Sequence, residues 1–176
     1  AYIFDVHLTP YPYQPYDIRD GLITTEAQAI AAAQSTRSAS SVLSNMSSAL
    51  ASGNPVFLTG DFNEPSHLDW TQDAATAGLN FGMKVNWPTS RSVTNAGLTD
   101  AFRQLRPDEV LDRGETWTPG YPAPNTDFNE VHDRIDFVYY KGNNVTPLNA
   151  QTLGYDSNDG NTDIAVQPYP SDHRAV

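Results

Sequence analysis

The chain has 176 residues, 39% of them hydrophobic, which is enough to bury one core and falls within the usual size of a single domain. Its 10 basic and 21 acidic residues give a formal net charge of -11, which repels polyanions and argues against broad nonspecific DNA binding. The absence of cysteine excludes a disulfide framework, a thiolate metal site and a cysteine nucleophile.

No apolar run approaches the roughly 18 residues of a membrane-spanning helix, so no membrane partner is expected. Lysine occurs only at Lys84 and Lys141, while Ser, Thr, Asn and Tyr are plentiful, a composition that favours a secreted or periplasmic protein. The acidity still permits a phosphate substrate, because a bound divalent cation inverts the local field.

Hydrophobic periodicity predicts the first elements along the chain. Residues 2–8 alternate between two faces and predict a strand with His7 near its carboxyl end. Three prolines in residues 9–16 predict a loop, whose tyrosines, among them Tyr13, offer flat surfaces beside a site. A capping-box pattern and apolar residues at helical spacing predict one long helix from about Thr25 to about Ser52.

The second half is predicted to alternate strands, short helices and loops. An unbroken apolar run at 56–58 predicts a strand covered on both faces, and hence a layered α/β arrangement. Short helices are expected at 70–77, capped by Ser66, and at 98–105. Strands are expected at 115–118, within irregular chain, and at 134–140, whereas 156–163 is expected to be a loop. No repeat or domain boundary is present.

Asp61 and Asn63 directly follow the buried strand. Residues two apart on an extended backbone point to the same side, so this carboxylate and carboxamide would face one reacting group. Together they can orient a water molecule and hold an oxygen of that group. The alternative is that Gly60 permits a tight turn whose amides these two side chains satisfy.

His173 needs an acid other than its neighbour Asp172 to orient it, because adjacent side chains on a strand point to opposite faces. Asp136, isolated on an apolar strand, is the candidate, since a buried aspartate requires a partner such as His173 or Arg134. The alternative for Asp136 is a structural salt bridge to Arg134 or Arg174. His7 taken alone is most often a hydrogen-bonded strand histidine.

Three further possibilities have weaker support in the sequence: a role for His67 and Asp69, a zinc site and a calcium loop. His67 and Asp69 would either contact a leaving group or second ion, or cap and anchor the following helix. A zinc site is not expected, because no His-x-x-x-His pair is present. Residues 156–163 invite comparison with a calcium loop, but Gly160 falls one position early and Gln167 replaces the bidentate Glu. A solvated turn with weak Ca²⁺ binding is expected there.

Four motifs in this order resemble the endonuclease/exonuclease/phosphatase superfamily: the strand ending at His7, then Gly60-Asp61-Phe62-Asn63, Arg134-Ile135-Asp136-Phe137-Val138 and Ser171-Asp172-His173. Each is short, but their order and spacing across nearly the whole chain are specific. The resemblance implies an α/β (α+β) fold, a four-layered sandwich of two mostly antiparallel sheets flanked by helices. Residues 1–176 would form a single domain.

The resemblance also implies catalytic roles. Asp61 would orient or deprotonate the attacking water, and Asn63 would position that water and the phosphate. His7 and His173 would hydrogen-bond the nonbridging oxygens as charge builds on phosphorus, while Asp136 would fix the tautomer and charge of His173.

A metal is implied as well. Asp172 and Asp61 would hold a divalent ion, for which Mg²⁺ or Mn²⁺ suits all-oxygen ligation. Members of the superfamily carry an N-terminal segment with an Asn and the principal metal-binding Glu, and no residue precedes Ala1 to supply them. We therefore expect this chain to be the C-terminal two thirds or so of the family domain, incomplete at the N-terminus, with the missing N-terminal segment as its partner.

The expected function is metal-dependent hydrolysis of a phosphoester by in-line attack of water. A small phosphodiester or phosphomonoester is favoured as substrate, with Asn63, Tyr13 and His67 as candidate binding residues, because no basic patch is evident. A nuclease acting on DNA or RNA with the same site is one alternative. A noncatalytic binding module that keeps the fold but lacks the metal-binding Glu is another, and whether this chain by itself is active stays open.

Overall fold

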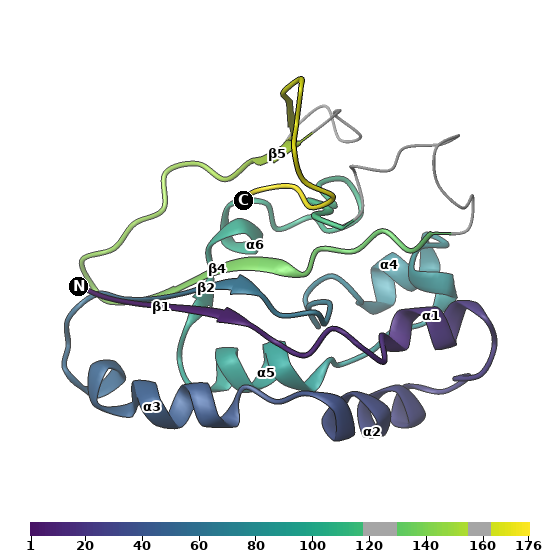
Figure 1. Cartoon of the computed structure of the whole chain (residues 1–176), viewed down its shortest axis with the longest axis horizontal. Helices are drawn as coiled ribbons and strands as arrows, with labels where there is room; N and C mark the ends of the chain where they lie inside the picture. Colours follow the sequence, from purple (N-terminus) through teal and green to yellow (C-terminus); the bar gives the residue numbers. More distant parts are fainter. Residues whose placement is uncertain (118–129, 155–162) are drawn as a thin grey trace.

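A four-stranded mixed sheet lies at the centre of the computed structural model, which describes residues 1–117, 130–154 and 163–176 (Figure 1). The strand order is β1-β2-β4-β3. β1 (Tyr2–His7) runs parallel to β2 (Val56–Asp61), and β4 (Asp136–Lys141) runs antiparallel to both β2 and β3 (Thr99–Asp100). The carboxyl ends of β1 and β2 therefore meet the beginning of β4 at one end of the sheet.

Helices cover one face of this sheet. α3 (Ser40–Ala51) and α5 (Pro88–Asn95) lie on the same side of the strands in Figure 1. They pack against the apolar faces of β2 and β4 in a cluster that includes Met46, Val56, Leu58, Val93, Phe137 and Tyr139. α2 (Glu26–Thr36) contributes Ala29 and Ala33 to a second cluster, with Trp70 and Trp87.

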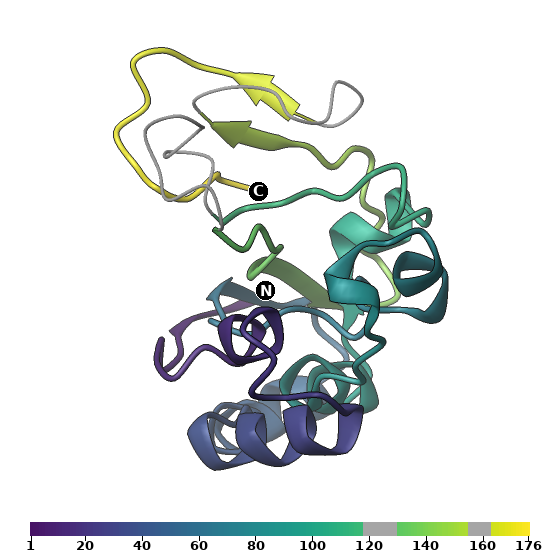
Figure 2. The same cartoon turned by 90° about the vertical axis from the view of Figure 1, so that its right-hand side faces the viewer.

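A second, smaller sheet lies on the other side. β5 (Thr152–Gly154) and β6 (Asp163–Ala165) pair in parallel, and neither strand was expected. In Figure 2 they lie above the central strands, while α2, α3 and α5 lie below. The α/β class expected from the sequence is confirmed, with two of the three pairings in the central sheet antiparallel.

The single long helix predicted over 25–52 was wrong, because two helices, α2 and α3, occupy this stretch. They are separated at Arg37, which is buried. Its guanidinium donates hydrogen bonds to the carbonyl oxygens of Thr9 at 2.9 Å and Pro12 at 2.7 Å, and to Gln14 Oε1 at 2.7 Å. Those partners lie more than twenty residues away, so local helical periodicity did not reveal the break.

The loop predicted over 9–16 ends earlier than expected. α1 (Gln14–Arg19) begins inside it, with Pro15 in the first helical turn, where the missing amide proton of proline is tolerated. The remaining loop joins the end of β1 to α1. It is the segment whose carbonyl groups bind Arg37.

Other short elements differ in their boundaries. α4 (Gln72–Thr76) is capped by Thr71 rather than Ser66, and α6 (Ala101–Leu105) is capped by Asp100. A one-turn helix, η1 (Asn80–Gly82), and α5 were not expected. In the expected strand at 115–118, the described residues form only isolated bridges at Trp117.

The candidate calcium loop lies outside the described residues except for Asp163, which begins β6. Over the described ranges, no helix is long and apolar enough to cross a membrane.

Asp133 is a buried acid just before β4. Its carboxylate accepts hydrogen bonds from the Tyr13 hydroxyl at 2.7 Å and from Trp70 Nε1 at 2.9 Å. Burial raises the pKa of Asp133 to about 6, although the two hydrogen bonds oppose the shift. Asp133 thus joins the loop after β1 to the chain that enters β4.

Gly60→Ala is expected to separate β1 from β2. Gly60 has φ +124°, and a Cβ there would lie 1.9 Å from the Val6 carbonyl oxygen on the paired strand. We expect a loss of at least about 3 kcal/mol in the free energy of unfolding, measured by urea denaturation. Gly78→Ala is the control, because Gly78 has φ +83° but no atom within 4 Å of the added carbon. Equal losses in the two variants would contradict this account of Gly60.

Stability should depend on pH through Asp133. Its folded pKa of about 6 lies above the unfolded value of 3.8, so the neutral acid is the form that the fold favours. The stability that Asp133 contributes is therefore fully present below pH 3.8 and is lost as the pH rises through 6. Relative to Asp133→Asn, the wild type should lose roughly 3 kcal/mol over this interval, measured by urea denaturation at several pH values. A difference that stays constant with pH would refute the prediction.

Candidate active site

The register of the central sheet places three predicted site residues in one row. His7 pairs with Asp61 across β1 and β2, and Asp61 pairs with Asp136 across β2 and β4. Residues directly opposite in neighbouring strands point to the same face. That face is the one turned away from α3 and α5, because alternate residues such as Val56 and Leu58 occupy the helix-covered core.

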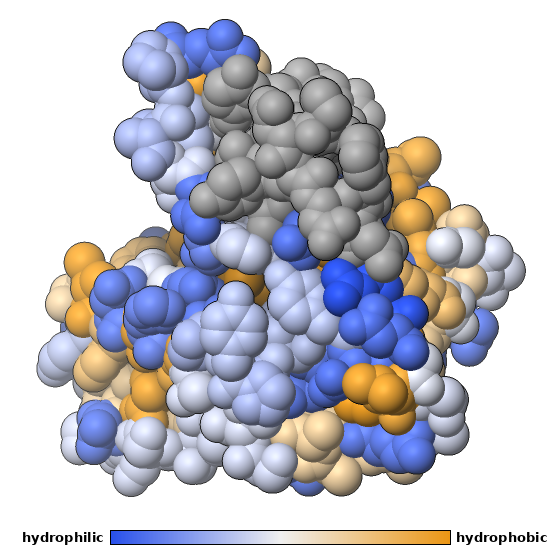
Figure 3. Space-filling view, turned by 45° about the vertical axis from the view of Figure 1, so that its right-hand side comes forward, coloured by the Kyte–Doolittle hydropathy of each residue, from blue (hydrophilic) through white to orange (hydrophobic). Residues whose placement is uncertain are grey.

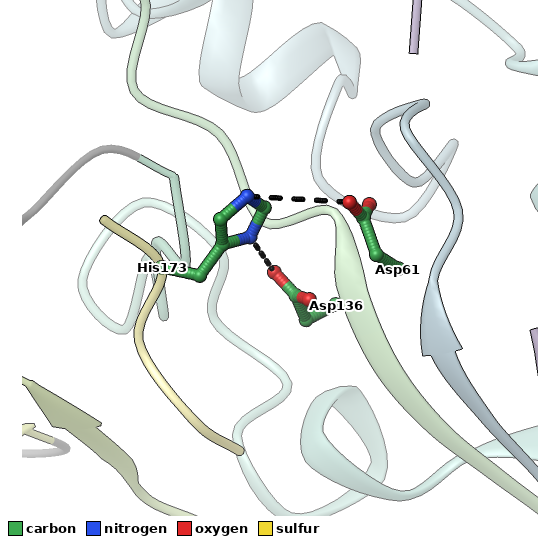
Figure 4. Close-up of side chains that lie close together, drawn as sticks. All are labelled: Asp61, Asp136 and His173. Atoms are coloured by element: carbon green, nitrogen blue, oxygen red, sulfur yellow. Dashed lines mark hydrogen bonds and ion pairs between the residues drawn. The ribbon is translucent and has the colours of Figure 1, made fainter. Parts of the chain in front are cut away.

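His173 completes this group from the C-terminal segment. Its Nδ1 lies 2.8 Å from Asp136 Oδ2, and its Nε2 lies 4.0 Å from Asp61 Oδ2 (Figure 4). A bridge between His173 and Trp117 and a 2.7 Å hydrogen bond from the Arg174 amide to the Thr116 carbonyl hold the segment in place. Because an ionised carboxylate only accepts hydrogen bonds, Nδ1 carries the proton and donates a hydrogen bond to Asp136.

Asn63 follows Asp61 in a left-handed turn with φ +48°. Its amide N donates to Asp61 Oδ1 at 2.7 Å, and its Nδ2 donates to Asp61 Oδ2 at 3.0 Å and to the Leu8 carbonyl at 2.9 Å. Asp61 therefore does satisfy a turn amide, as the structural alternative proposed. The same hydrogen bonds fix both side chains beside the end of β1.

His7 approaches Asp61 from the opposite side to His173. Its Nε2 lies 3.6 Å from Asp61 Oδ2, and its side chain is 74% exposed. Two imidazole nitrogens thus lie within 4.0 Å of one carboxylate oxygen. Protonated imidazoles in these positions would donate hydrogen bonds to an anion beside Asp61.

The environment shifts the pKa values of the two central groups. Burial raises the pKa of Asp61, as does the nearby charge of Asp136, while the Asn63 amide and the two histidines oppose the shift. Burial lowers the pKa of His173, but the hydrogen bond and charge of Asp136 outweigh it and hold the pKa above its usual value. The pair therefore combines a carboxylate of increased basicity with a readily protonated imidazole.

These residues open onto a cavity of about 240 Å³. Its polar part is formed by His7, Asp61, Asn63, Asp172 and His173, and its less polar part by Pro10, Tyr11, Tyr13, Tyr16, Trp117 and Ile135. Figure 3 shows a face on which hydrophilic residues predominate and hydrophobic residues form separate patches. The cavity therefore has a polar part beside a less polar part.

Several side chains could hold a metal ion. Asp61, Asp136 and His173 offer ligand atoms that all lie within 4.8 Å of one another. Asp136 Oδ2 and His173 Nδ1 already bind each other, so a metal held by those two atoms would displace that hydrogen bond. Asp61 and Asp172 both line the cavity and provide the hard oxygen donors that Mg²⁺ and Mn²⁺ prefer.

The structure places His67 away from the cavity. His67 Nδ1 lies 2.8 Å from Ser90 Oγ, and His67 is not among the residues that line this cavity. Asp69 binds Arg103 and Arg134 in a buried ion-pair network. His67 thus binds a residue of α5, and Asp69 binds α6 and the chain before β4, whereas the following helix α4 is capped by Thr71. The geometry supports neither the capping of that helix by His67 and Asp69 nor the prediction that His67 binds substrate in this cavity.

Arg134 is not the partner of Asp136. Its guanidinium binds Asp69 at 2.9 Å and Asp100 at 2.8 Å, and these carboxylates raise its pKa although burial lowers it. Asp136 binds His173 instead. The salt bridge proposed as the alternative role of Asp136 is therefore not formed with Arg134.

Of the aromatic residues that line the cavity, the tyrosines of residues 9–16 were expected beside a site, whereas Trp117 was not singled out. Of this group only Tyr13 was predicted to bind substrate, and it is 5% exposed with its hydroxyl directed at Asp133. Tyr11, Tyr16 and Trp117 line the cavity as well. The available signal was the run of tyrosines directly after His7.

The chain is similar to a known protein family and to a protein of an animal. The chain matches the model of the Endonuclease/Exonuclease/phosphatase family over residues 3–173. It is also 38% identical over 128 residues to "Uncharacterized protein F14F9.5" of Caenorhabditis elegans, an alignment that takes in 69% of this chain and 39% of that protein. The chain belongs to the endonuclease/exonuclease/phosphatase family.

Proposed function

We propose that this chain takes part in divalent-metal-dependent hydrolysis of a phosphoester by in-line attack of water. The observation that carries the proposal is the convergence of His7 Nε2 and His173 Nε2 on Asp61 Oδ2, at 3.6 and 4.0 Å. Membership of a family whose members are generally hydrolases supports it. The arrangement supplies a base and two hydrogen-bond donors around one small space.

Asp61 is the group that orients and deprotonates water in this proposal. Its raised pKa favours acceptance of a proton, and its hydrogen bonds from Asn63 hold the carboxylate in one orientation. Asn63 is itself fixed by the Leu8 carbonyl at 2.9 Å. The attacking water would therefore meet a base that is already positioned.

The two histidines stabilise developing negative charge. Because Asp136 accepts the proton on His173 Nδ1, the outer nitrogen Nε2 carries a proton only when the ring is charged. The raised pKa of His173 favours that charged form. His7 would donate to a nonbridging oxygen from the other side, which is the electrostatic contribution that most assists phosphoryl transfer.

The donor set also suits a divalent ion. Asp61 and Asp172 would hold Mg²⁺ or Mn²⁺ through carboxylate oxygens, with water or other groups as further ligands. Such an ion would polarise a phosphoryl oxygen and stabilise the leaving alkoxide. Asp172 is well placed for this role because it lines the cavity and its charge also reaches His173.

A small phosphoester is the proposed substrate class. The cavity of about 240 Å³ matches a small ester group, and the formal charge of -11 disfavours a long polyanion.

Asp61→Asn and His173→Ala should each abolish turnover of a chromogenic phosphodiester by the full-length protein with Mg²⁺ or Mn²⁺. Loss of the base or of the donor is expected to lower kcat by about 10² to 10⁴ while the circular dichroism spectrum is retained. His67→Ala is the control, because His67 is half-buried like His173 but lies away from the cavity. Near wild-type activity in either cavity variant would refute the assignment.

Asp136→Asn should shift the alkaline limb of the activity profile to lower pH. The limb follows deprotonation of His173, whose pKa is held up by the Asp136 carboxylate against the effect of burial. Removing that charge should move the limb to lower pH, measured as kcat/KM against pH. Asp5→Asn serves as control, since Asp5 is exposed on β1 and bonds Thr59. An unchanged limb would show that His173 does not act as the charged donor.

A further inference from the structure

Aromatic rings form one side of the cavity next to the proposed phosphate position. Tyr11 and Tyr16 come from the connection after β1 and from α1, and Trp117 comes from a segment a hundred residues later. The Trp117 ring lies 4.9 Å from the His173 ring, measured between centroids. The aromatic side, which we call the aromatic wall (Tyr11, Tyr16 and Trp117), therefore borders one of the groups that would contact the phosphate.

The ring that faces solvent most is Tyr11. It is 64% exposed, although it lines the cavity, whereas its neighbour Tyr13 is 5% exposed. Tyr13 packs edge-on against Tyr16 with ring centroids 5.1 Å apart, and its hydroxyl binds Asp133. Tyr13 thus holds the ring of Tyr16, whereas Tyr11 leaves a large ring surface available to a ligand.

The wall is held by interactions behind it. The Arg37 guanidinium binds the carbonyls of Thr9 and Pro12, on either side of Tyr11. On the other segment, the Trp117 amide and carbonyl both pair with the backbone of Asp133 at 2.9 Å. Because these contacts order the wall before a ligand arrives, binding has less conformational entropy to offset.

The shape and composition of the cavity indicate a planar ligand. Pro10 and Ile135 are the aliphatic residues among those that line it, whereas the other apolar surface consists of flat Tyr and Trp rings. A cavity of about 150 Å³ accommodates a benzene molecule. The volume of about 240 Å³ therefore holds one ring together with a phosphoryl group.

We infer that the aromatic wall is a subsite for a planar ring, either an aryl group or a nucleobase, that is attached to the phosphoryl group of the substrate through its ester. The inference rests on the proposed function, because it takes the polar part of the cavity as the phosphate position. The ring would stack on Tyr11 and against Trp117, while the phosphoryl group lies between His7 and His173. Ring identity, rather than overall charge, would then decide which small phosphoester binds well.

Two nonhydrolysable phosphonates test the subsite without requiring turnover. Benzylphosphonate carries a planar ring, butylphosphonate carries an aliphatic chain, and both present the same anionic head group. Binding to the full-length protein with Mg²⁺ or Mn²⁺ is measured by titration calorimetry. Benzylphosphonate should bind about tenfold more tightly, since stacking of a ring on an aromatic side chain is of that order.

Variants at Tyr11 identify the residue responsible. Tyr11→Ala should remove most of the preference for benzylphosphonate and leave butylphosphonate binding unchanged, whereas Tyr11→Phe should keep the preference. Tyr2→Ala is the matched control, because Tyr2 is 43% exposed on β1 and does not line the cavity. Tyr11 is largely exposed, so its replacement should not unfold the protein.

The outcomes separate the subsite from the proposed function. A preference for benzylphosphonate that depends on Tyr11 supports the subsite, even if no phosphoester is hydrolysed, in which case the proposed function fails alone. Equal binding of the two phosphonates by a protein that hydrolyses phosphoesters overturns the subsite alone. Absence of binding by both overturns the subsite, and absence of hydrolysis in the same preparation overturns the proposed function with it.

Discussion

The pairing register of β1, β2 and β4 is the constraint on which the site depends. It sets His7, Asp61 and Asp136 side by side on one face, although they lie far apart in the sequence. A shift of one residue in either pairing would turn the side chain of His7 or Asp136 to the opposite face. The apolar residues on the helix-covered face oppose such a shift, so the core that stabilises the sheet also aligns the site.

Arg134 and Asp136 are two residues apart on the chain that enters β4, but they have different ion-pair partners. Arg134 is committed to Asp69 and Asp100, while Asp136, two residues later, faces His173. Among the described residues, the His173 imidazole is therefore the ion-pair partner of Asp136. The pKa of His173 is therefore raised by Asp136, Asp61 and Asp172, whereas Asp69 and Asp100 bind Arg134.

Motifs and strand periodicity were sufficient to predict the family, the α/β class and the residues that meet at Asp61. His7, Asp61, Asn63, Asp136 and His173 do come together, and their catalytic roles stay predictions. The break between α2 and α3 was not visible because it depends on Arg37 reaching carbonyl groups of a distant loop. The tyrosines of the aromatic wall were expected beside a site, but Trp117 was missed, since it joins them only through tertiary pairing with Asp133.

The mode of Arg37 binding has a consequence for how this site can diverge. Arg37 binds the loop after β1 largely through main-chain carbonyl groups, including those of Thr9 and Pro12. Main-chain acceptors are the same whatever side chains the loop carries. A substitution at Tyr11 would therefore leave these hydrogen bonds in place, so the loop can keep its path while the side chain that it presents to the cavity changes.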